Sequence, residues 1–299
     1  MIRKEVKDFC LRHVFDCGQC FRWNQEEDGS YTGTAMGRTV NLRLLPPENG
    51  SPQYLEIEGT DETEFETVWR PYLDLDRDYA GIKKTLAKED PIMAEAILAG
   101  SGIRLLRQEP WETLISFLIS QNNNIPRIKK CIEMLSSRFG EELPEFRGAK
   151  RFAFPTVETL AALTPEALAE IRLGYRARYI IETARAVAQD GGQMLRSLPG
   201  RSAEEAYAYL TGLCGVGPKV ANCILLFSME KYDRFPVDVW VRRVMEELYH
   251  LEEKETGGIE AFAAEHFGEY GGFAQQYLFY YMREKNKKNV LTLSGKRVQ

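Results

Sequence analysis

The segment from Leu210 to Met245 constrains the fold of this chain more than any other part of the sequence. It contains the turn Gly215–Val216–Gly217, which leads into Pro218 and an apolar run. Glycine allows the backbone angles of a tight turn, and proline suits the first position of a helix. With the helical pattern before the turn, this predicts a helix–hairpin–helix whose second helix offers free N–H groups to a phosphate. A glycine-rich link between two packed helices is the alternative.

Lys219 follows the turn directly and falls in the first turn of the second helix. A cation is disfavoured at this positive end of the helix dipole, which favours the neutral amine. An amine that is readily neutral is a candidate nucleophile. The alternative is an exposed lysine that contacts a phosphate.

Asp238 stands immediately before the segment VWVRRVM, which has the pattern of another helix. Aspartate is a preferred N-cap, because its side chain accepts N–H bonds from the turn that follows. Structural capping alone would account for the residue. Such bonds also keep the carboxylate ionised, so that it can stabilise a cationic transition state.

The hydrophobic pattern divides the chain into two parts and indicates an α+β fold. From Val14 to about Glu58, short alternating segments such as TVNLRLL predict an antiparallel sheet. Residues 61–95 have a helical pattern, and from about Pro110 onward the pattern is helical almost throughout. We therefore expect an N-terminal domain of residues 1–105 and a catalytic domain of residues 106–299, with the helix–hairpin–helix at about 203–228.

Five segments along nearly the whole chain resemble those of the helix–hairpin–helix base-excision DNA glycosylases. The match is nearest to the 8-oxoguanine DNA glycosylase family, and the segments occur in the family's order. The resemblance implies a small TATA-binding-protein-like antiparallel sheet domain, followed by an all-helical glycosylase domain. The segments are CGQCFRW, ISFLISQNNNIPRI, LGYRARYI, LTGLCGVGPKVANCI with the later VDVWV, and GGFAQQYLF.

The resemblance assigns roles to six residues of a catalytic and base-recognition pocket. Lys219 matches the lysine that attacks the sugar C1′ and forms a Schiff base, and Asp238 matches the catalytic aspartate. Gly18 matches the glycine whose carbonyl accepts the N7–H of 8-oxoguanine, a proton that guanine lacks. The three remaining residues match those that contact the flipped base: Cys223, Gln275 and Phe279.

Four further residues match those that deal with the opposite strand. Asn122, Arg127 and Arg176 match residues that fill the gap and contact the orphaned cytosine, while Tyr175 matches the wedge that holds the duplex open. Arginine and asparagine offer fixed donors to base edges, and an aromatic ring replaces lost stacking. Taken singly, a polar turn or a half-buried core aromatic would explain these residues. With both arginines present, we expect a preference for cytosine opposite the lesion.

Two positions depart from the family pattern. Trp240 stands where the resemblance implies a histidine that touches the phosphate beside the flipped nucleotide. Met282 stands where it implies an aspartate that supports the pocket. These departures leave the phosphate contact and the support of the pocket open, but not the class of reaction.

Charge and composition fit DNA binding only if the charge is unevenly distributed. The formal net charge of the 299 residues is −5, and residues 61–78 are strongly acidic. The segment Arg172–Arg185, in contrast, carries four arginines and one glutamate. We expect a polarised surface and salt-sensitive binding to double-stranded DNA that contains 8-oxoguanine. With neither a membrane-length apolar run nor a signal-peptide core, we expect a cytoplasmic monomer.

The six cysteines indicate free thiols in a reducing compartment. Cys10, Cys17 and Cys20 have the spacing of the first three cysteines in the iron–sulfur loop of endonuclease III-like relatives. Glu26 stands at the fourth position, and the segment lies among predicted strands, so we interpret the spacing as coincidence. We expect no metal and no organic cofactor.

Three other functions stay open. A monofunctional glycosylase for alkylated purines shares the hairpin and the aspartate but uses water and needs no amine. An adenine or pyrimidine glycosylase of the iron–sulfur branch would need a C-terminal cysteine loop. A non-catalytic helix–hairpin–helix DNA-binding protein would explain the glycines of the turn, but not Lys219 and Asp238 together.

Overall fold

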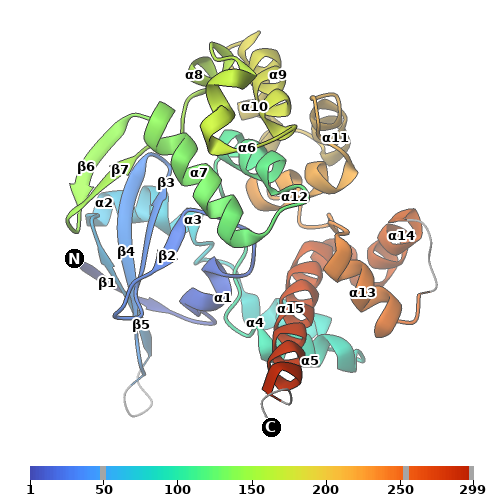
Figure 1. Cartoon of the computed structure of the whole chain (residues 1–299). Coiled ribbons are helices and arrows are strands. Elements are labelled where there is room, and N and C mark those ends of the chain that lie inside the picture. Colours follow the sequence, from blue (N-terminus) through green and yellow to red (C-terminus); the bar gives the residue numbers. More distant parts are fainter. Residues whose placement is uncertain (48–51, 252–255, 296–299) are drawn as a thin grey trace.

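The fold combines one antiparallel sheet with a larger set of helices (Figure 1). It is seen in a computed structural model that describes residues 1–47, 52–251 and 256–295, without the side chains of residues 256–257 and 288–295. None of the helices within these described ranges is both long and apolar enough to cross a membrane.

Five strands form the sheet in the order β1-β5-β4-β3-β2, and all neighbours are antiparallel. Alternate residues of the central strands point into the core, so that Leu42 and its partner Ile57 are fully buried. This confirms the predicted antiparallel sheet. The sheet also includes an earlier strand that was not predicted, since its side chains are mostly charged. The strands are β1 (Ile2–Val6), β2 (Trp23–Gln25), β3 (Tyr31–Ala35), β4 (Arg38–Leu45) and β5 (Gln53–Glu58).

Short helical segments cover one face of the sheet. The helix α1 (Leu11–Phe15) brings Phe15 onto Trp23, with ring centroids 4.0 Å apart. The indole N–H of Trp23 donates to the Tyr72 hydroxyl at 2.9 Å. Tyr72 ends a continuous helical stretch made of α2 (Glu62–Glu64), a π-helical turn (Phe65–Trp69) and α3 (Arg70–Tyr72). These aromatic contacts form a separate core between the sheet and its covering helices.

The rest of the chain is mainly helical and surrounds a second, larger core. Three short 3-10 helices, at Pro165–Ile171, Leu198–Gly200 and Gly268–Tyr270, connect some of its elements. The α-helices are α4 (Tyr79–Leu86), α5 (Pro91–Ala99), α6 (Pro110–Ser120), α7 (Ile125–Phe139), α8 (Val157–Ala161), α9 (Arg176–Ala188), α10 (Gln193–Ser197), α11 (Ala203–Thr211), α12 (Pro218–Ser228), α13 (Val239–Glu247), α14 (Thr256–Phe267) and α15 (Gly271–Gly295).

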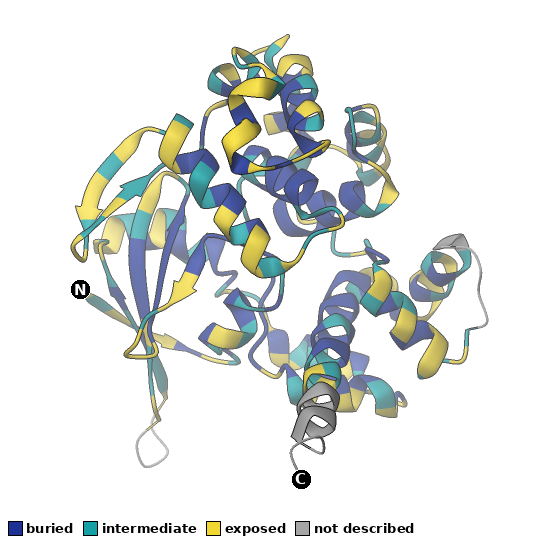
Figure 2. Cartoon of the chain, viewed as in Figure 1, coloured by how far each residue is buried: buried dark blue, intermediate teal, exposed yellow. Residues whose placement is uncertain are grey.

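The helices α12 and α6 lie at the centre of this core. Every residue of α12 from Val220 to Ser228 is buried, and so is every residue of α6 from Thr113 to Ile119 (Figure 2). A helix that is covered on all sides must be largely apolar on all sides, which explains the runs VANCILLF and TLISFLI. The first turn of α12 is therefore anchored by the best-packed part of the molecule.

The helices α4 and α5 precede residue 105 in the chain but pack with later elements. Their residues Ile82, Met93 and Ala96 belong to the larger core, and α5 lies along α15 (Figure 1). Leu106, in contrast, belongs to the core of the sheet. The segment that follows the sheet thus crosses to the helical side before the chain reaches α6.

Residues 142–152 differ from the helical expectation, because they form a β-hairpin. The strands β6 (Glu142–Phe146) and β7 (Ala149–Phe152) are joined by Arg147 and Gly148, both at positive φ (50° and 71°). Two such residues make the turn that suits the twist of a two-residue hairpin. Most side chains of the hairpin are at least partly exposed, so the sequence lacks the clear alternation of a half-buried strand.

Candidate active site

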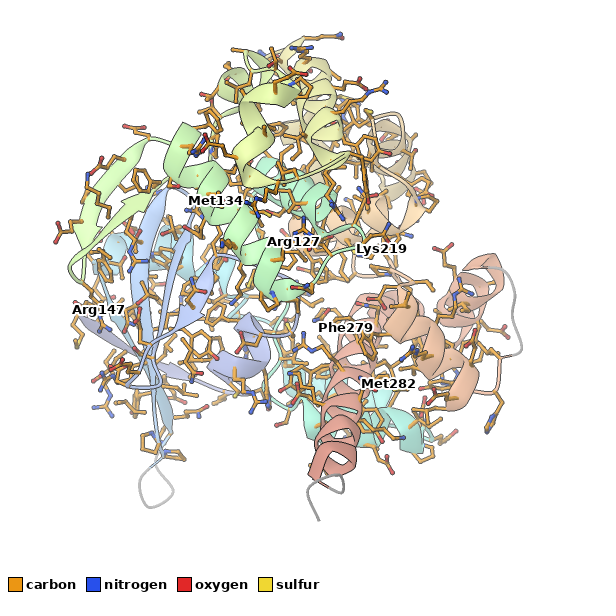
Figure 3. The ribbon with its side chains drawn as sticks, in the orientation of Figure 1. Arg127, Met134, Arg147, Lys219, Phe279 and Met282 are labelled. Atoms are coloured by element: carbon orange, nitrogen blue, oxygen red, sulfur yellow. The ribbon has the colours of Figure 1, made fainter. Side chains whose placement is uncertain are left out.

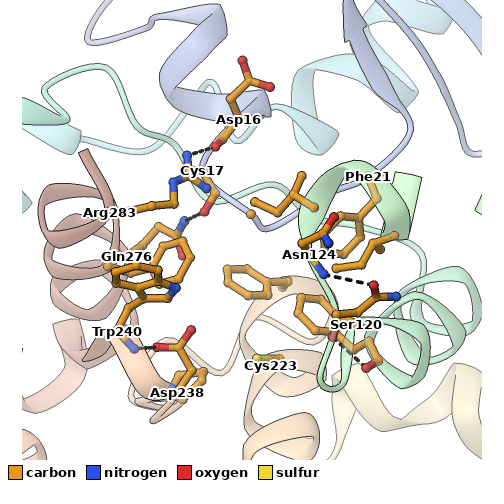
Figure 4. Close-up of a pocket in the computed structure, with 18 of the residues that line it drawn as sticks. Asp16, Cys17, Phe21, Ser120, Asn124, Cys223, Asp238, Trp240, Gln276 and Arg283 are labelled. Atoms are coloured by element: carbon orange, nitrogen blue, oxygen red, sulfur yellow. Dashed lines mark hydrogen bonds between the residues drawn. The ribbon is translucent and has the colours of Figure 1, made fainter. Parts of the chain in front are cut away.

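A pocket of about 700 Å³ lies where separate segments of the chain meet (Figure 4). One wall comes from the loop after α1, another from α6 and the start of α7, and the others from α12, the start of α13 and α15. Lys219 on α12 and Phe279 on α15 face the same central space (Figure 3). The pocket brings together all six residues predicted for catalysis and base recognition: Lys219, Asp238, Gly18, Cys223, Gln275 and Phe279.

The loop between α11 and α12 has the geometry of a hairpin at a helix N-terminus. Gly215 adopts a φ of 76°, and a Cβ at this position would lie 2.4 Å from Cδ2 of Tyr179, so only glycine fits. The side-chain amide of Gln121 donates to the Gly215 carbonyl at 3.1 Å. Gly217 is exposed and caps α12, Pro218 takes the first helical position, and the side chain of Val216 is buried. The free N–H groups at the start of α12 can therefore donate hydrogen bonds to a phosphate.

Lys219 is the second residue of α12, and its ammonium faces an aromatic ring. The Nζ atom lies 5.3 Å from the centroid of Phe117, which also lines the pocket. Cys223 lies one turn further along the same face of the helix and is buried. Burial raises the pKa of the Cys223 thiol, and Lys219 only partly offsets this effect. The thiol therefore stays neutral beside the amine.

Asp238 caps α13 as expected. Its Oδ1 accepts the backbone N–H groups of Trp240 at 2.9 Å and of Val241 at 2.8 Å (Figure 4). Burial raises the pKa of the Asp238 carboxyl, while these two bonds and the charge of Lys219 oppose the rise. The capping contacts fix the carboxyl at the edge of the pocket, on the same cavity as the lysine.

Gly18 and α15 form the opposite wall of the pocket. Gly18 adopts a φ of 84°, and a Cβ there would lie 3.2 Å from Cε1 of Phe279, so the loop and the ring are in close contact. Gln275 is one turn before Phe279 and is only 5% exposed. Within the described part of the chain, its side-chain oxygen Oε1 has no hydrogen-bond donor. A buried amide oxygen without a partner, on the wall of a cavity, is ready to accept a bond from a ligand.

The four residues predicted to contact the opposite strand lie together, outside the lining of this pocket. Asn122, at a φ of 46°, directs its amide to the Tyr175 hydroxyl at 3.4 Å. Tyr175 is 48% exposed, and Arg127 is exposed with one bond to the Arg172 carbonyl at 3.0 Å. Arg176, in contrast, is buried.

The guanidinium of Arg176 binds three backbone carbonyls. Its donors reach the carbonyls of Gln121 at 2.8 Å, Asn122 at 3.0 Å and Leu173 at 3.1 Å. Arg176 thus ties the loop after α6 to the start of α9, and in this structure its guanidinium is engaged within the protein.

Comparison with known proteins identifies the family of this chain. Residues 1–114 match the 8-oxoguanine DNA glycosylase N-terminal domain, and residues 115–268 match the HhH-GPD superfamily of base excision DNA repair proteins. The N-glycosylase/DNA lyase OGG1 of Arabidopsis thaliana is 36% identical over 91% of this chain and 77% of its own length. The chain belongs to the 8-oxoguanine DNA glycosylase family.

Solved structures of family members superpose over nearly the whole chain. The structure of MBOgg1 in complex with a low-affinity DNA ligand is 46% identical, with a TM-score of 0.89, covering 95% of this chain and 96% of that one. The 8-oxoguanine glycosylase/lyase of Clostridium acetobutylicum, bound to double-stranded DNA with cytosine opposite 8-oxoguanine, is 42% identical. Its TM-score is 0.86, and the match covers 96% of this chain and 99% of that one.

The two departures from the family pattern have different surroundings. Trp240 lines the pocket beside Asp238, and the guanidinium of Arg243 lies 5.2 Å from the centroid of its ring. Met282 is buried in the helical core and does not line the pocket. The first substitution therefore changes the pocket wall itself, and the second changes only the packing behind it.

Two of the three cysteines that resemble an iron–sulfur spacing have thiol contacts to backbone carbonyls. Cys17 and Cys20 are buried, and their thiols lie 3.1 Å and 3.9 Å from the carbonyls of Val14 and Phe15. Burial raises the pKa of the Cys17 thiol to about 11 and that of Cys20 well above its usual value. The short loop after α1 that carries Gly18 is thus held partly by its own cysteines.

Sequence reasoning missed two pocket residues of α15 that hold this loop. The side-chain amide of Gln276 donates to the Cys17 carbonyl at 2.7 Å, and the guanidinium of Arg283 donates to the Asp16 carbonyl (Figure 4). Both residues line the pocket. Arg283 follows Phe279 by one helical turn, so the spacing on α15 contains a signal that places it on the same face.

Proposed function

We propose that this glycosylase excises 8-oxoguanine from duplex DNA, preferably opposite cytosine, and then nicks the strand at the resulting abasic site. The observation that supports this most strongly is the convergence of an amine, a half-buried carboxyl and an unpaired amide oxygen on one pocket. An amine nucleophile distinguishes a glycosylase with lyase activity from one that uses water. We further propose that the protein acts as a monomer, because all six residues assigned to catalysis and base recognition come together within one chain, and that it acts in the cytoplasm.

The first chemical step is displacement of the base. The neutral amine of Lys219 attacks C1′ of the sugar, and the bond from C1′ to N9 breaks with its electron pair going to the departing base. The nitrogen of Lys219 gives up one proton as it bonds to C1′, and the departing base takes up one proton at N9. Asp238, held by two N–H bonds, stabilises the positive charge that develops on the sugar. Burial of the carboxylate strengthens this effect, since charges interact more strongly away from water.

The second step is β-elimination at the same sugar. The sugar ring opens, and C1′ and Nζ of Lys219 form an imine. The imine acidifies the C2′ proton, and a base removes that proton. The bond from C3′ to the phosphate oxygen then breaks, and the phosphate leaves. The strand is nicked 3′ to the lesion, and water later releases the sugar from the lysine.

Recognition of the base rests on hydrogen bonds at two of its edges. The Gly18 carbonyl accepts the N7–H of 8-oxoguanine, and the unpaired oxygen of Gln275 accepts an N–H of the Watson–Crick edge. Guanine has no proton on N7 and would leave the Gly18 carbonyl facing another acceptor. An unpaired buried group costs about 1–3 kcal/mol. Stacking on Phe279 and the cost of flipping must supply the rest of the selectivity.

The hairpin and the four residues outside the pocket hold the distorted duplex. The N–H groups at Gly215 and Gly217 bind a phosphate of the lesion strand, while Tyr175 and Asn122 occupy the space left by the flipped nucleotide. Arg127 is exposed and reaches the orphaned cytosine. Contacts of these types favour a duplex that has already lost its stacking at one base pair.

Borohydride trapping on a labelled duplex with 8-oxoguanine opposite cytosine tests the proposal. Reduction converts the imine into a stable bond, so the wild type is expected to give a covalent protein–DNA band. Lys219→Gln should give none, whereas Lys150→Gln, which changes an exposed lysine on β7, should trap like the wild type. Undamaged duplex should give no band with any variant.

The same experiment separates the competing functions. Release of free 8-oxoguanine without a band would contradict the role of Lys219 and indicate attack by water, as in a monofunctional glycosylase. Excision of alkylated purines, without excision of 8-oxoguanine, would assign the pocket to a different lesion. Tight binding to the duplex without release of any base would indicate that the protein is a non-catalytic helix–hairpin–helix DNA-binding protein.

A further inference from the structure

Arg283 is a buried cation on the pocket wall for which the proposed function has no role. The residue is 9% exposed, it lines the pocket, and its Cζ lies 5.5 Å from the ring centroid of Phe279. One nitrogen, Nη2, donates to the Asp16 carbonyl. Two others, Nε and Nη1, have no hydrogen-bond partner among the described residues. Buried donors of a guanidinium are rarely left unpaired, because their desolvation is costly.

The position of Nη1 relative to Gly18 indicates what it could bind. A Cβ placed on Gly18 would lie 3.8 Å from Nη1 of Arg283 and 3.2 Å from Cε1 of Phe279. The donor therefore borders both the glycine whose carbonyl is assigned to the base and the ring on which that base stacks. A ligand that occupies this corner of the pocket meets a carbonyl acceptor and a charged donor side by side.

The five-membered ring of 8-oxoguanine has the complementary pair of groups. Its N7 carries a proton, and the adjacent C8 carries a carbonyl oxygen, whereas guanine has a bare N7 and a C8–H. We propose that Arg283 donates a hydrogen bond from Nη1 to the C8 oxygen of the flipped base, next to the N7–H that Gly18 accepts. This rests on the proposed function, and it adds a second group that reads the lesion directly.

A purely structural role accounts for only part of the arrangement. The bond from Nη2 to Asp16 holds the loop after α1 against α15, and Gln276 holds the same loop through the Cys17 carbonyl at 2.7 Å. Neither bond uses Nε or Nη1. Gln276 therefore provides a matched control, because its substitution loosens the loop without removing the donor beside Gly18.

The test compares single-turnover excision of 8-oxoguanine and of 8-thioguanine, each opposite cytosine, with enzyme in excess. The thio base keeps the N7–H but presents sulfur, a weaker acceptor, at C8. Arg283→Met should slow excision of 8-oxoguanine about tenfold to a hundredfold, the range expected for a bond to a charged donor, and should slow 8-thioguanine much less. The preference of the wild type for oxygen over sulfur should shrink accordingly. Gln276→Met should lower the excision rates of 8-oxoguanine and 8-thioguanine by the same factor.

Equal slowing of the two substrates by Arg283→Met would overturn the inference and leave Arg283 as a residue that positions the loop. Arg283→Lys keeps the charge and most of the packing. If the methionine variant does not fold, the excision rates of 8-oxoguanine and 8-thioguanine are compared in the lysine variant instead. Its preference should lie between those of the wild type and the methionine variant. Failure of the wild type to excise 8-oxoguanine at all would instead refute the proposed function.

Discussion

The residues proposed to face the flipped base and those proposed to face the opposite strand differ in how far they are fixed by the protein. On the pocket side, Asp238 is held by two backbone N–H groups, and Gln275 and Cys223 are buried. On the opposite side, Tyr175 is 48% exposed, and Asn122 reaches it only through a long contact of 3.4 Å. The first set is fixed by the protein itself. In the second set only Arg176 is fixed in this way, by three backbone carbonyls, and the other three residues are free to gain contacts from a duplex.

The difference follows from what each set has to do. Chemistry at C1′ requires donors and charges at fixed positions, because reorganisation during the reaction would raise the barrier. Filling a gap in the DNA duplex requires side chains that adapt to the positions of the bases. Exposed residues can adapt in this way because they lose few contacts within the protein. Substitutions on the pocket side should therefore affect the chemical step, and those on the other side should affect binding and the choice of opposite base.

The largest effect of a change that preserves the fold is expected for Asp238→Asn. Asparagine also caps helices, so α13 should persist while the negative charge is lost. Single-turnover excision should fall by at least about a hundredfold, the usual cost of removing a preorganised electrostatic contact. Asp61→Asn, which changes the cap of α2 far from the pocket, is the matched control and should excise normally. A similar rate for the two variants would contradict the comparison.

The pH dependence of this carboxyl gives a second test of the same residue. Burial raises the pKa of Asp238 above 3.8, so activity of the wild type should fall as pH drops through this raised value. Because the pKa of Asp238 is higher in the folded than in the unfolded protein, the folded state binds the proton more tightly. The free energy of unfolding therefore includes a stabilising contribution from this proton at low pH, below the unfolded pKa. That contribution is lost as pH rises through the folded pKa. Asp238→Asn should lack both trends, as measured by rate profiles and by unfolding in denaturant.

For Gln275→Leu we expect a smaller fall in the excision rate than for Asp238→Asn, together with a gain in stability. The unpaired oxygen of Gln275 is buried, so an apolar side chain should raise the free energy of unfolding by on the order of 1 kcal/mol. Excision of 8-oxoguanine should nevertheless fall about tenfold or more, because the bond to the base is lost. Denaturant unfolding and single-turnover rates measure the two quantities. A loss of stability would mean that the amide has a partner within the protein.

On the opposite side, the two predicted arginines should behave differently from each other. Arg127→Ala should leave stability nearly unchanged and lower the preference for cytosine over adenine about tenfold, the range of one good contact to a base. Arg176→Met should cost about 2 kcal/mol of unfolding free energy, because three carbonyls lose a charged donor. Excision opposite each of the four bases, together with unfolding curves, separates the two roles. Equal loss of stability in both variants would refute the distinction.

The smallest effect is expected for Tyr175→Ala. The ring is half exposed, and among the described residues its hydroxyl is contacted only by the Asn122 amide at 3.4 Å, so the fold should tolerate its loss. Binding to lesion duplex should weaken about fivefold to tenfold, the lower end of the range for the loss of one stacking contact. Tyr175→Phe keeps the ring and should bind like the wild type. If the phenylalanine variant were as weak as the alanine variant, the hydroxyl rather than the ring would carry the contact.

Local chemistry made the centre of the site predictable. Gly215, Pro218 and Asp238 each take a position set by backbone geometry over a few residues, and such preferences can be recognised in a sequence. The pocket residues of the remote segments, Gly18 and those of α15, were reached only through the family resemblance. No local pattern in the chain reveals that residue 18 and residue 279 are in contact.

The features that escaped prediction depend on tertiary contacts. The burial of Arg176 and Arg283 follows from carbonyls of distant loops, since an arginine in a helix is ordinarily exposed. The hairpin β6–β7 has little buried surface and so no strong pattern. The packing of α4 and α5 against α15 depends on the order in which the chain crosses between its two cores.

The bond between Gln276 and Cys17 joins residues that are 259 positions apart, and this separation has a consequence for synthesis on the ribosome. The lysine and the aspartate emerge before α15, so a growing chain holds the nucleophile before it holds the wall that inspects the base. The loop that carries Gly18 gains its bond from Gln276 only after α15 has been synthesised. The proposed ability to tell damaged from normal DNA is thus acquired after the nucleophile, once α15 has folded against the loop.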